Sequence, residues 1–300
     1  MFGEFLGLWC VQVWYDQGKP SPKRLVELGP GRGTLMADAL RAMQVAPEFM
    51  NDLEIVLVEV SPALRDLQRE NLKIWGDKVR WTAQFDESLG DRPLFLLANE
   101  FFDALPVRQY VKTDRGWCER MVTVDADGAL AFALSPVAAN VTIPADRQVA
   151  PDGGVYEVSP SSIALIETIA GVVAHQGGGA LIVDYGYDTP GFGETLQAVA
   201  SHAFATVLEE PGEADLSAHV NFLSLVAQAR DAGAEAYGPA GQGDFLENLG
   251  LMERAKRLGA MHNAEAIWKA VDRLVAPDQM GTLFKILAIV PKNAPKPPGF

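Results

Sequence analysis

The stretch V-E-L-G-P-G-R-G-T-L, Val26–Leu35, predicts a buried strand that passes through a glycine turn into a helix. Glycine permits the positive φ values of a tight turn, and without side chains the backbone amides stay open to a ligand. Apolar residues continue at helical spacing over residues 34–43. Strand, turn and helix together make the glycine pattern a nucleotide-site hypothesis. The glycines of the turn are Gly29, Gly31 and Gly33.

The spacing of these glycines discriminates between ligands. A dinucleotide fingerprint requires glycine at position 34, where this chain has threonine. A P-loop requires a lysine after the turn, and none is present there. The remaining pattern, G-x-G-x-G preceded by the acid Glu27, is typical of S-adenosylmethionine-dependent methyltransferases, with a plain tight turn as the alternative.

A second apolar segment supports the nucleotide interpretation. Residues 54–60, E-I-V-L-V-E-V, predict a strand covered on both faces, and Ser61-Pro62 then begins a helix. Glu59 ends this strand, where a carboxylate accepts hydrogen bonds from both hydroxyls of a bound ribose. The alternative is an ordinary charged residue at a strand end. Glu59 is therefore predicted to bind the cofactor.

The composition excludes several classes of function. The chain of 300 residues has a net charge of −14, which argues against nucleic acid and fits a basic protein or peptide, or merely solubility. Two cysteines and four histidines without metal-ligand spacing predict no disulfide framework and no metal. No apolar run reaches membrane length, so no membrane insertion is expected. Residues 2–14 predict a core helix rather than a targeting signal, and a chain that begins inside a helix suggests a shortened sequence or an alternative start.

Strands and helices alternate along the first hundred residues, which predicts an α/β fold with a doubly wound parallel sheet. Further strands are predicted over 79–83, 94–99, 180–184, 234–237 and 282–290, and a helix over 221–232. The predicted core comprises 1–107 and 176–300, and 108–175 is an inserted antiparallel, substrate-side segment with a meander over 108–148. Further insertions are expected over 187–218 and 239–280, the latter with helices over 245–258 and 264–274, and the tail 291–300 is expected to be disordered.

The end of the fourth strand carries the predicted chemistry, in N-E-F-F-D-A-L-P over residues 99–106. In this sheet order the first and fourth strands are neighbours, so these residues face the methyl group of a bound cofactor. Methyl transfer requires an acceptor lone pair in line with the S–CH₃ bond and water excluded. Glu100 and Asp103 are predicted to grip the planar guanidinium of an arginine. Phe101 or Phe102 is predicted to stack on the cofactor or the acceptor, and both are counted as substrate residues. The alternative is that both rings are simply core and that one of the two acids satisfies backbone donors in the turn.

Several motifs along the chain are similar to one known family. They are V-E-L-G-P-G-R-G-T-L at 26–35, A-N-E-F-F-D-A-L-P-V at 98–107, Y-E-V-S-P at 156–160, L-I-V-D-Y-G-Y at 181–187, A-H-V-N-F at 218–222, Q-G-D-F-L at 242–246 and M-G-T-L-F-K-I-L at 280–287. The sequence resembles the MidA-like methyltransferases, a family that includes the mitochondrial complex I assembly factor that methylates a protein arginine. The resemblance implies a seven-strand class I (Rossmann-like) fold, S-adenosyl-L-methionine as cofactor and a protein arginine as acceptor. It also implies a link to respiratory complex assembly.

The resemblance also implies a cell compartment and leaves alternatives open. The cytoplasm is expected for a prokaryotic protein and the mitochondrial matrix for a eukaryotic one. One alternative is methylation of a small molecule or of a side chain other than arginine. The other is a non-catalytic assembly or binding protein that retains the cofactor pocket.

The matched segments imply further site residues. Asn99, like Glu27, is placed with the cofactor-binding residues, while Asp184, Tyr185 and His219 are placed around the acceptor. Asp184 has a structural cap as its alternative role, and His219 a packing role. Two departures from the family stand out: the upstream segment with a Gly-Asp-Phe motif, expected from the resemblance, does not precede Met1 here, and Asn221 occupies a position where aspartate is expected.

Overall fold

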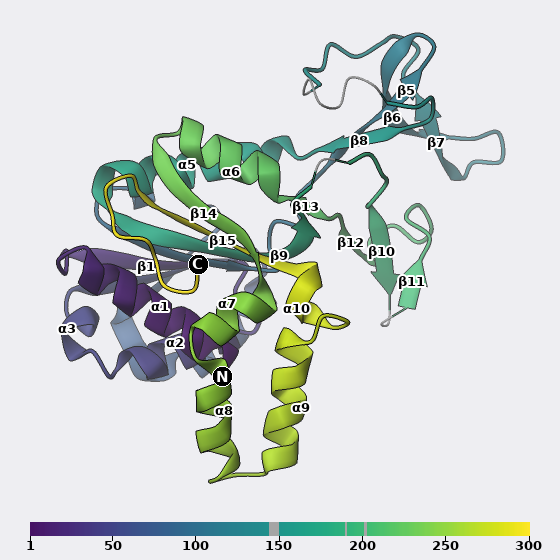
Figure 1. The fold of residues 1–300 in the computed structure, drawn as a ribbon. Helices are drawn as coiled ribbons and strands as arrows, with labels where there is room; N and C mark the ends of the chain where they lie inside the picture. Colours follow the sequence, from purple (N-terminus) through teal and green to yellow (C-terminus); the bar gives the residue numbers. More distant parts are fainter. Residues whose placement is uncertain (144–149, 190, 201–202) are drawn as a thin grey trace.

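The computed structural model describes residues 1–143, 150–189, 191–200 and 203–300, and its centre is a large, mainly parallel sheet. Figure 1 shows this sheet between two layers of helices. Its strand order is β14-β15-β9-β4-β1-β2-β3, with the short β13 paired to β9. The strands are β1 (Lys23–Leu28), β2 (Leu53–Val58), β3 (Val79–Thr82), β4 (Leu94–Asn99), β9 (Gly178–Tyr187), β13 (Val220–Asn221), β14 (Ala234–Gly241) and β15 (Phe284–Pro291).

The pairing confirms the predicted doubly wound sheet. β1 lies between β2 and β4, β9 lies beside β4, and all these pairs are parallel. β15 runs antiparallel to both β9 and β14. The carboxyl ends of β1, β2, β4 and β9 therefore meet at one edge, called here the carboxyl edge, and their starts form the amino edge.

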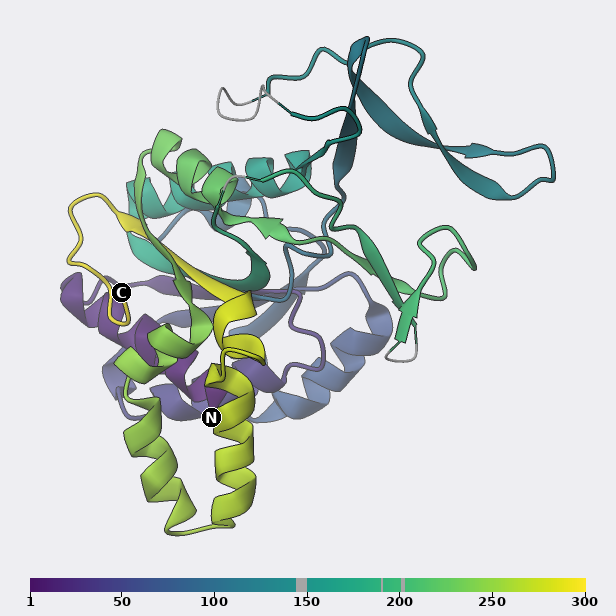
Figure 2. The same cartoon turned by 45° about the vertical axis from the view of Figure 1, so that its right-hand side comes forward.

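Helices cover both faces of the sheet (Figures 1 and 2). The helices nearest the sheet in the first half of the chain are α1 (Phe2–Asp16), α2 (Thr34–Met43), α3 (Pro47–Met50) and α4 (Pro62–Asn71), with short 3₁₀ turns at η1 (Lys73–Lys78) and η2 (Glu87–Leu89). On the opposite face lie α5 (Pro160–Gln176) and α6 (Phe222–Asp231). β4 shows how one strand serves two cores: Phe95 and Leu97 pack on the α1–α2 side, and Leu94 and Leu96 on the α5–α6 side.

Two smaller sheets lie outside this core. β5 (Arg108–Thr113), β6 (Gly116–Val124), β7 (Leu130–Leu134) and β8 (Val155–Val158) form an antiparallel sheet in the order β7-β6-β5-β8. β10 (Gln197–Ala200), β11 (Ala203–Ala205) and β12 (Asp215–Ser217) form the second. The predicted meander over 108–148 includes 144–148, which lie outside the described residues. The division of the chain into core and insertion stays a prediction; α5, assigned by it to the insertion, packs on the central sheet.

A helical hairpin projects from the end of the sheet (Figure 1). The two helices that project are α8 (Leu251–Gly259) and α9 (Ala264–Val275), and the short α7 (Gln242–Asn248) and α10 (Met280–Leu283) join them to β14 and β15. The single helix predicted over 245–258 is wrong, because Gly250 adopts φ +89° and separates α7 from α8. The last strand begins at Phe284 rather than 282, since α10 occupies the preceding turn.

The expectation of a disordered tail over 291–300 is also wrong. The Trp9 indole donates a hydrogen bond to the carbonyl of Pro298 at 3.2 Å. The ring of Phe300 lies 5.2 Å from that of Phe245, centroid to centroid. Pro297 is buried as well. These apolar groups bury surface against α1 and α7, which the proline-rich composition of the tail did not reveal.

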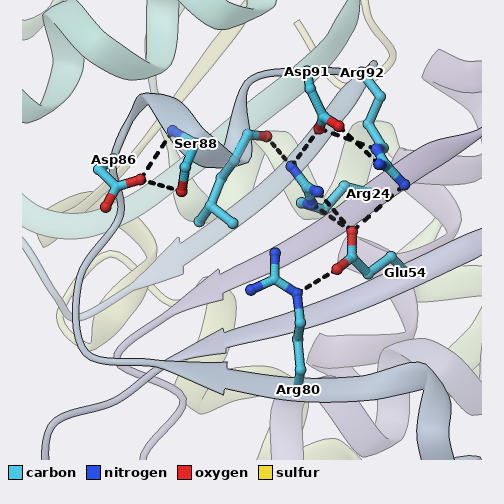
Figure 3. A network of polar contacts seen from close by, with 8 residues as sticks. Arg24, Glu54, Arg80, Asp86, Ser88, Asp91 and Arg92 are labelled. Atoms are coloured by element: carbon cyan, nitrogen blue, oxygen red, sulfur yellow. Dashed lines mark hydrogen bonds and ion pairs between the residues drawn. The ribbon is translucent and has the colours of Figure 1, made fainter.

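Charged residues at the amino edge form a fully partnered network, shown in Figure 3. Arg24 of β1 is almost completely buried and reaches Glu54 at 2.7 Å and Asp91 at 3.0 Å. It also donates to the carbonyl of Leu89. Glu54 in turn accepts from Arg80 and lies 3.6 Å from Arg92. Each buried charge here is compensated, so this edge of the sheet is a structural element.

Candidate active site

The glycine turn lies between β1 and α2 at the carboxyl edge, and its three glycines serve different purposes. All three have positive φ: +58° at Gly29, +52° at Gly31 and +76° at Gly33. A Cβ on Gly29 would lie 2.7 Å from the ring of Phe101, and one on Gly33 would lie 3.2 Å from the side chain of Gln68. A Cβ on Gly31 would meet nothing within 4 Å. The open approach to the backbone is therefore at Gly31, while the other two glycines admit protein side chains.

Gln68 joins the glycine turn to the end of β2. It is fully buried on α4, and its amide nitrogen donates to the carbonyl of Gly31 at 2.7 Å and to Glu59 Oε2 at 3.2 Å. Its amide oxygen accepts from the Trp81 indole at 2.8 Å. The other oxygen of Glu59 accepts from the amide of Ser61 at 2.8 Å. Glu59 thus lies beside the glycine turn, with its orientation fixed by protein donors.

Glu27 lies within β1, directly before the turn, and is 3% exposed. Its Oε2 is buried and has no hydrogen-bond partner within the described part of the chain. Burial raises the pKa of Glu27 to about 8, against a smaller lowering effect from the amide of Met36. A buried carboxyl oxygen without a partner beside an open glycine backbone is unusual in a folded protein and is typical of a ligand site.

The loop 99–103, called here the acid loop, follows β4. Glu100 adopts φ +50° and is exposed, and the side-chain amide of Asn99 donates to its carboxylate at 3.3 Å. One oxygen of Asp184, at the end of β9, accepts hydrogen bonds from the backbone amides of Phe101, Phe102 and Asp103 at 3.1, 2.9 and 3.2 Å. Its other oxygen accepts from the amide of Tyr185 at 3.0 Å. Asp184 is 0% exposed, so the structure favours its capping role over substrate contact.

The two phenylalanines of the acid loop point to different surroundings. Their rings form an edge-to-face pair with centroids 5.7 Å apart. Phe101 is half-buried and covers Gly29. Phe102 is 2% exposed and belongs to the core on the α5–α6 side, which agrees with the alternative interpretation of core packing. Phe101 is therefore the aromatic residue of this pair that lies at the glycine turn.

Asp103 is the second carboxyl without a full set of partners. Its Oδ1 is buried and has no hydrogen-bond partner among the described residues. Burial raises the pKa of Asp103 and the charge of Glu100 raises it further, while a hydrogen bond to Tyr185 lowers it. Burial and the charge of Asp103 likewise raise the pKa of Asp184 well above its usual value. Within the described residues, no ion pair joins Glu100, Asp103 or Asp184 to a basic side chain, so carboxyl groups are concentrated here.

Two neighbouring cavities that share part of their lining lie between β8, β9 and the start of α6, and Phe102 lines the smaller one. One has a volume of about 50 Å³ and the other of about 260 Å³, and Glu157, Tyr187 and His219 line both. The imidazole of His219 meets the Tyr185 ring edge-to-face at 5.2 Å. Asn221 lines the smaller cavity, and its side chain caps α6 by accepting from the amide of Ser224 at 3.2 Å. An aspartate at position 221 would make the same cap.

Comparisons with known proteins identify the family of this chain. A family model described as "Putative S-adenosyl-L-methionine-dependent methyltransferase" matches residues 5–240. The chain belongs to this family. Consistent with the open turn at Gly31, the cofactor of this methyltransferase is S-adenosyl-L-methionine.

Curated relatives and a solved structure also support the assignment to this methyltransferase family. The methyltransferase is 36% identical to protein arginine methyltransferase NDUFAF7, mitochondrial, of Xenopus tropicalis, over 98% of this chain and 74% of that protein. Identity to the human protein of that name is 35%, over 97% of this chain and 71% of that protein. A Burkholderia thailandensis protein bound to S-adenosyl-homocysteine superposes with a TM-score of 0.83 at 29% identity, over 99% of this chain and 78% of that one.

Sequence reasoning missed Gln68, which carries the link between the turn and Glu59. A signal was present, since Gln68 follows Leu64 by four residues and so occupies the inward side of α4. A polar side chain on an inward helical position needs buried partners. Which groups those partners are depends on how α4 docks on β2 and β3. The sequence therefore does not show that one of them is the carbonyl of Gly31.

Proposed function

We propose that this methyltransferase transfers the methyl group to arginine side chains of a protein. The observation that carries the proposal is the acid loop: an exposed carboxylate at Glu100 next to a buried, unpartnered carboxyl oxygen at Asp103. A guanidinium supplies several planar donors and a positive charge, which match two such carboxyls. The names of the curated relatives support the same acceptor.

Each predicted site residue has a role in this proposal. The backbone at Gly31 and the carboxylate of Glu59 hold the methionyl and ribose parts of the cofactor, with Glu27 and Asn99 beside them. Phe101 covers the turn and excludes water. Asp184 and Phe102 fix the acid loop from behind, and Tyr185 and His219 border the acceptor.

The chemistry places one demand on the acid loop. The cofactor supplies an electrophilic methyl group on its sulfonium. The acceptor nitrogen that gains this methyl group must lose one proton. We assign Asp103, next to Glu100 in the acid loop, as the base that takes this proton; burial raises its pKa, which makes its carboxylate a better proton acceptor than an exposed aspartate. Glu100 then holds the positive charge of the guanidinium in place during transfer.

The test is transfer of labelled methyl groups to a proteome extract, followed by mapping of the methylated residues. Arginine is the expected position. Label in small molecules or on other side chains would replace the arginine proposal with the first alternative, and cofactor binding without any transfer would support the binding-protein alternative.

Glu100→Gln sharpens this test. We expect it to lower turnover about 10- to 100-fold, because the neutral amide no longer holds the guanidinium charge, while affinity for the cofactor stays within about twofold. Glu70→Gln on the exposed side of α4 is the matched control and should retain full turnover. Equal loss of turnover and cofactor affinity in Glu100→Gln would assign Glu100 to folding of the loop instead.

The partner and compartment follow from the same proposal. The net charge of −14 favours a substrate with a basic segment around the arginine. Participation in respiratory complex assembly is part of this proposal. The named relatives are mitochondrial, and we assign this protein to the mitochondrial matrix in a eukaryote or to the cytoplasm in a prokaryote. Within the described ranges, no helix is long and apolar enough to cross a membrane.

A further inference from the structure

A buried carboxylate outside the acid loop organises a neighbouring segment. Glu157 of β8 is 7% exposed and lies about as deep as Glu59. Its Oε1 accepts from the side-chain amide of Gln109 at 2.8 Å and from the backbone amides of Thr195 and Leu196 at 3.0 and 3.3 Å. Its Oε2 accepts from the hydroxyl of Thr195. All four partners are donors, three to Oε1 and one to Oε2, so the carboxylate holds four donors of its surroundings in place.

The segment it holds, residues 191–197, is called here the strap. The strap lies beside β8 in space, where the amide of Gly193 donates to the carbonyl of Val155 at 3.0 Å. Phe192 stacks on Trp117 of β6, with ring centroids 5.9 Å apart. Arg120 pairs with Glu194 at 2.5 Å. The strap is thus fastened to the four-stranded antiparallel sheet.

The other side of the strap contacts the acceptor side of the active site. The hydroxyl of Thr195 accepts from the backbone amide of His219 at 2.9 Å. The side-chain amide of Gln197 donates to the hydroxyl of Tyr185 at 3.3 Å. Tyr185 packs against the His219 ring and hydrogen-bonds Asp103. One continuous set of bonds therefore runs from Glu157 through Thr195 and Gln197 to the tyrosine beside Asp103.

We propose that Glu157 is a positioning residue for methyl transfer: it fixes the strap, which sets the place of His219 through Thr195 and of Tyr185 through Gln197 at the acceptor. This inference rests on the proposed function only in taking the acceptor to bind at the acid loop. Glu157 lies outside the acid loop and acts through the strap that it holds. Its loss affects recognition of the acceptor and leaves the glycine turn, Gln68 and Glu59 unchanged, because none of them bonds to the strap.

Two substitutions test the path at different points. Glu157→Gln replaces an acceptor oxygen by an NH₂ group that faces donors. Thr195→Val removes the hydroxyl that serves both Glu157 and His219 at nearly constant volume. Thr195→Ser keeps the hydroxyl and should restore behaviour close to wild type. Glu119→Gln on β6 is the matched control, since its side chain pairs with Arg108 rather than with the strap.

The first measurement is native-state hydrogen exchange, which requires no substrate. The amides of Thr195, Leu196 and His219 should exchange about 10-fold faster in Glu157→Gln and Thr195→Val than in wild type, since a lost hydrogen bond of this kind is worth about one decade. Exchange in the glycine turn should stay the same. Unchanged exchange in the strap would overturn the proposal.

The second measurement is steady-state kinetics with whichever acceptor the labelling experiment identifies. KM for the acceptor should rise about 10-fold in both variants, with cofactor affinity within twofold of wild type and Thr195→Ser and Glu119→Gln near wild type. Parallel loss of cofactor affinity would show a general structural role and reject the positioning role. Label on an acceptor other than arginine would reject the arginine proposal alone, because the strap is judged by exchange and by the KM of the acceptor found.

Discussion

The two edges of the central sheet differ in whether their buried carboxyl groups all have partners. At the amino edge, Arg24 is buried yet bound by Glu54, Asp91 and the carbonyl of Leu89 (Figure 3). At the carboxyl edge, Glu27 and Asp103 each keep a buried oxygen without a partner in the described ranges. A third such atom is Oε1 of Gln242. This residue comes directly after β14, whose last residue lies at the same edge.

The difference separates stability from function in one fold. Burial would raise the pKa of Glu54, but its hydrogen bonds to Arg80 and Arg24 lower it, so the ionised form is stabilised by folding. Burial without such partners raises the pKa of Glu27 and of Asp103. Uncompensated groups cost folding free energy, so their concentration at one edge identifies that edge as the place where ligands complete the structure.

The largest effect is expected from Gly31→Val at the carboxyl edge. A branched side chain would fill the open space beside the turn and strain a backbone at φ +52°. Cofactor affinity should fall at least about 100-fold, or about 3 kcal/mol, in calorimetry with S-adenosyl-L-methionine. Gly18→Val is the matched control, because Gly18 has φ +79° and open space but lies before β1 at the other edge. An unchanged affinity in Gly31→Val would remove the turn from the cofactor site.

At the amino edge, Glu54→Gln should destabilise the fold without touching the cofactor. The change leaves the buried guanidinium of Arg24 with Asp91 as its remaining carboxylate, at an expected cost of about 2 kcal/mol in the free energy of unfolding. Urea denaturation at pH 7 measures it. Glu48→Gln, which breaks an exposed pair with Lys19, is the matched control and should leave the free energy of unfolding nearly unchanged. Since the pKa of Glu54 is lowered by folding, the loss should shrink as the pH falls below 4.5. A loss of cofactor affinity in this variant would contradict the separation of the two edges.

The central sheet could be predicted because its signals are local. Apolar runs such as 94–99 and the glycine turn define strands and their ends, and the alternation with helices predicts that these strands are parallel. Side-chain roles across strands could not be predicted in the same way. Asp184 lies more than eighty residues after the acid loop that it caps, and Gln68 bonds to Gly31 only because α4 docks beside the turn. The break at Gly250 and the packed tail were missed because composition alone does not show which surface a segment will cover.

The smallest effect, and the one most specific to the carboxyl edge, is a reversed pH dependence from Glu27. Folding raises its pKa from 4.5 to about 8, so the folded protein holds a proton that the unfolded chain releases. Stability without cofactor should therefore fall as the pH rises from about 4.5 to about 8, opposite in sign to the contribution of Glu54. Glu27→Gln removes this titration, and its thermal unfolding temperature should decline less than that of wild type over the window. Relative to wild type, Glu27→Gln should gain about 1 kcal/mol in the free energy of unfolding between pH 6 and pH 8. This is less than the full shift in pKa would give, because water and side chains relax around a buried charge. Parallel curves for both proteins would mean that the Glu27 carboxyl finds a partner in solution, and the contrast between the two edges would then rest on Asp103.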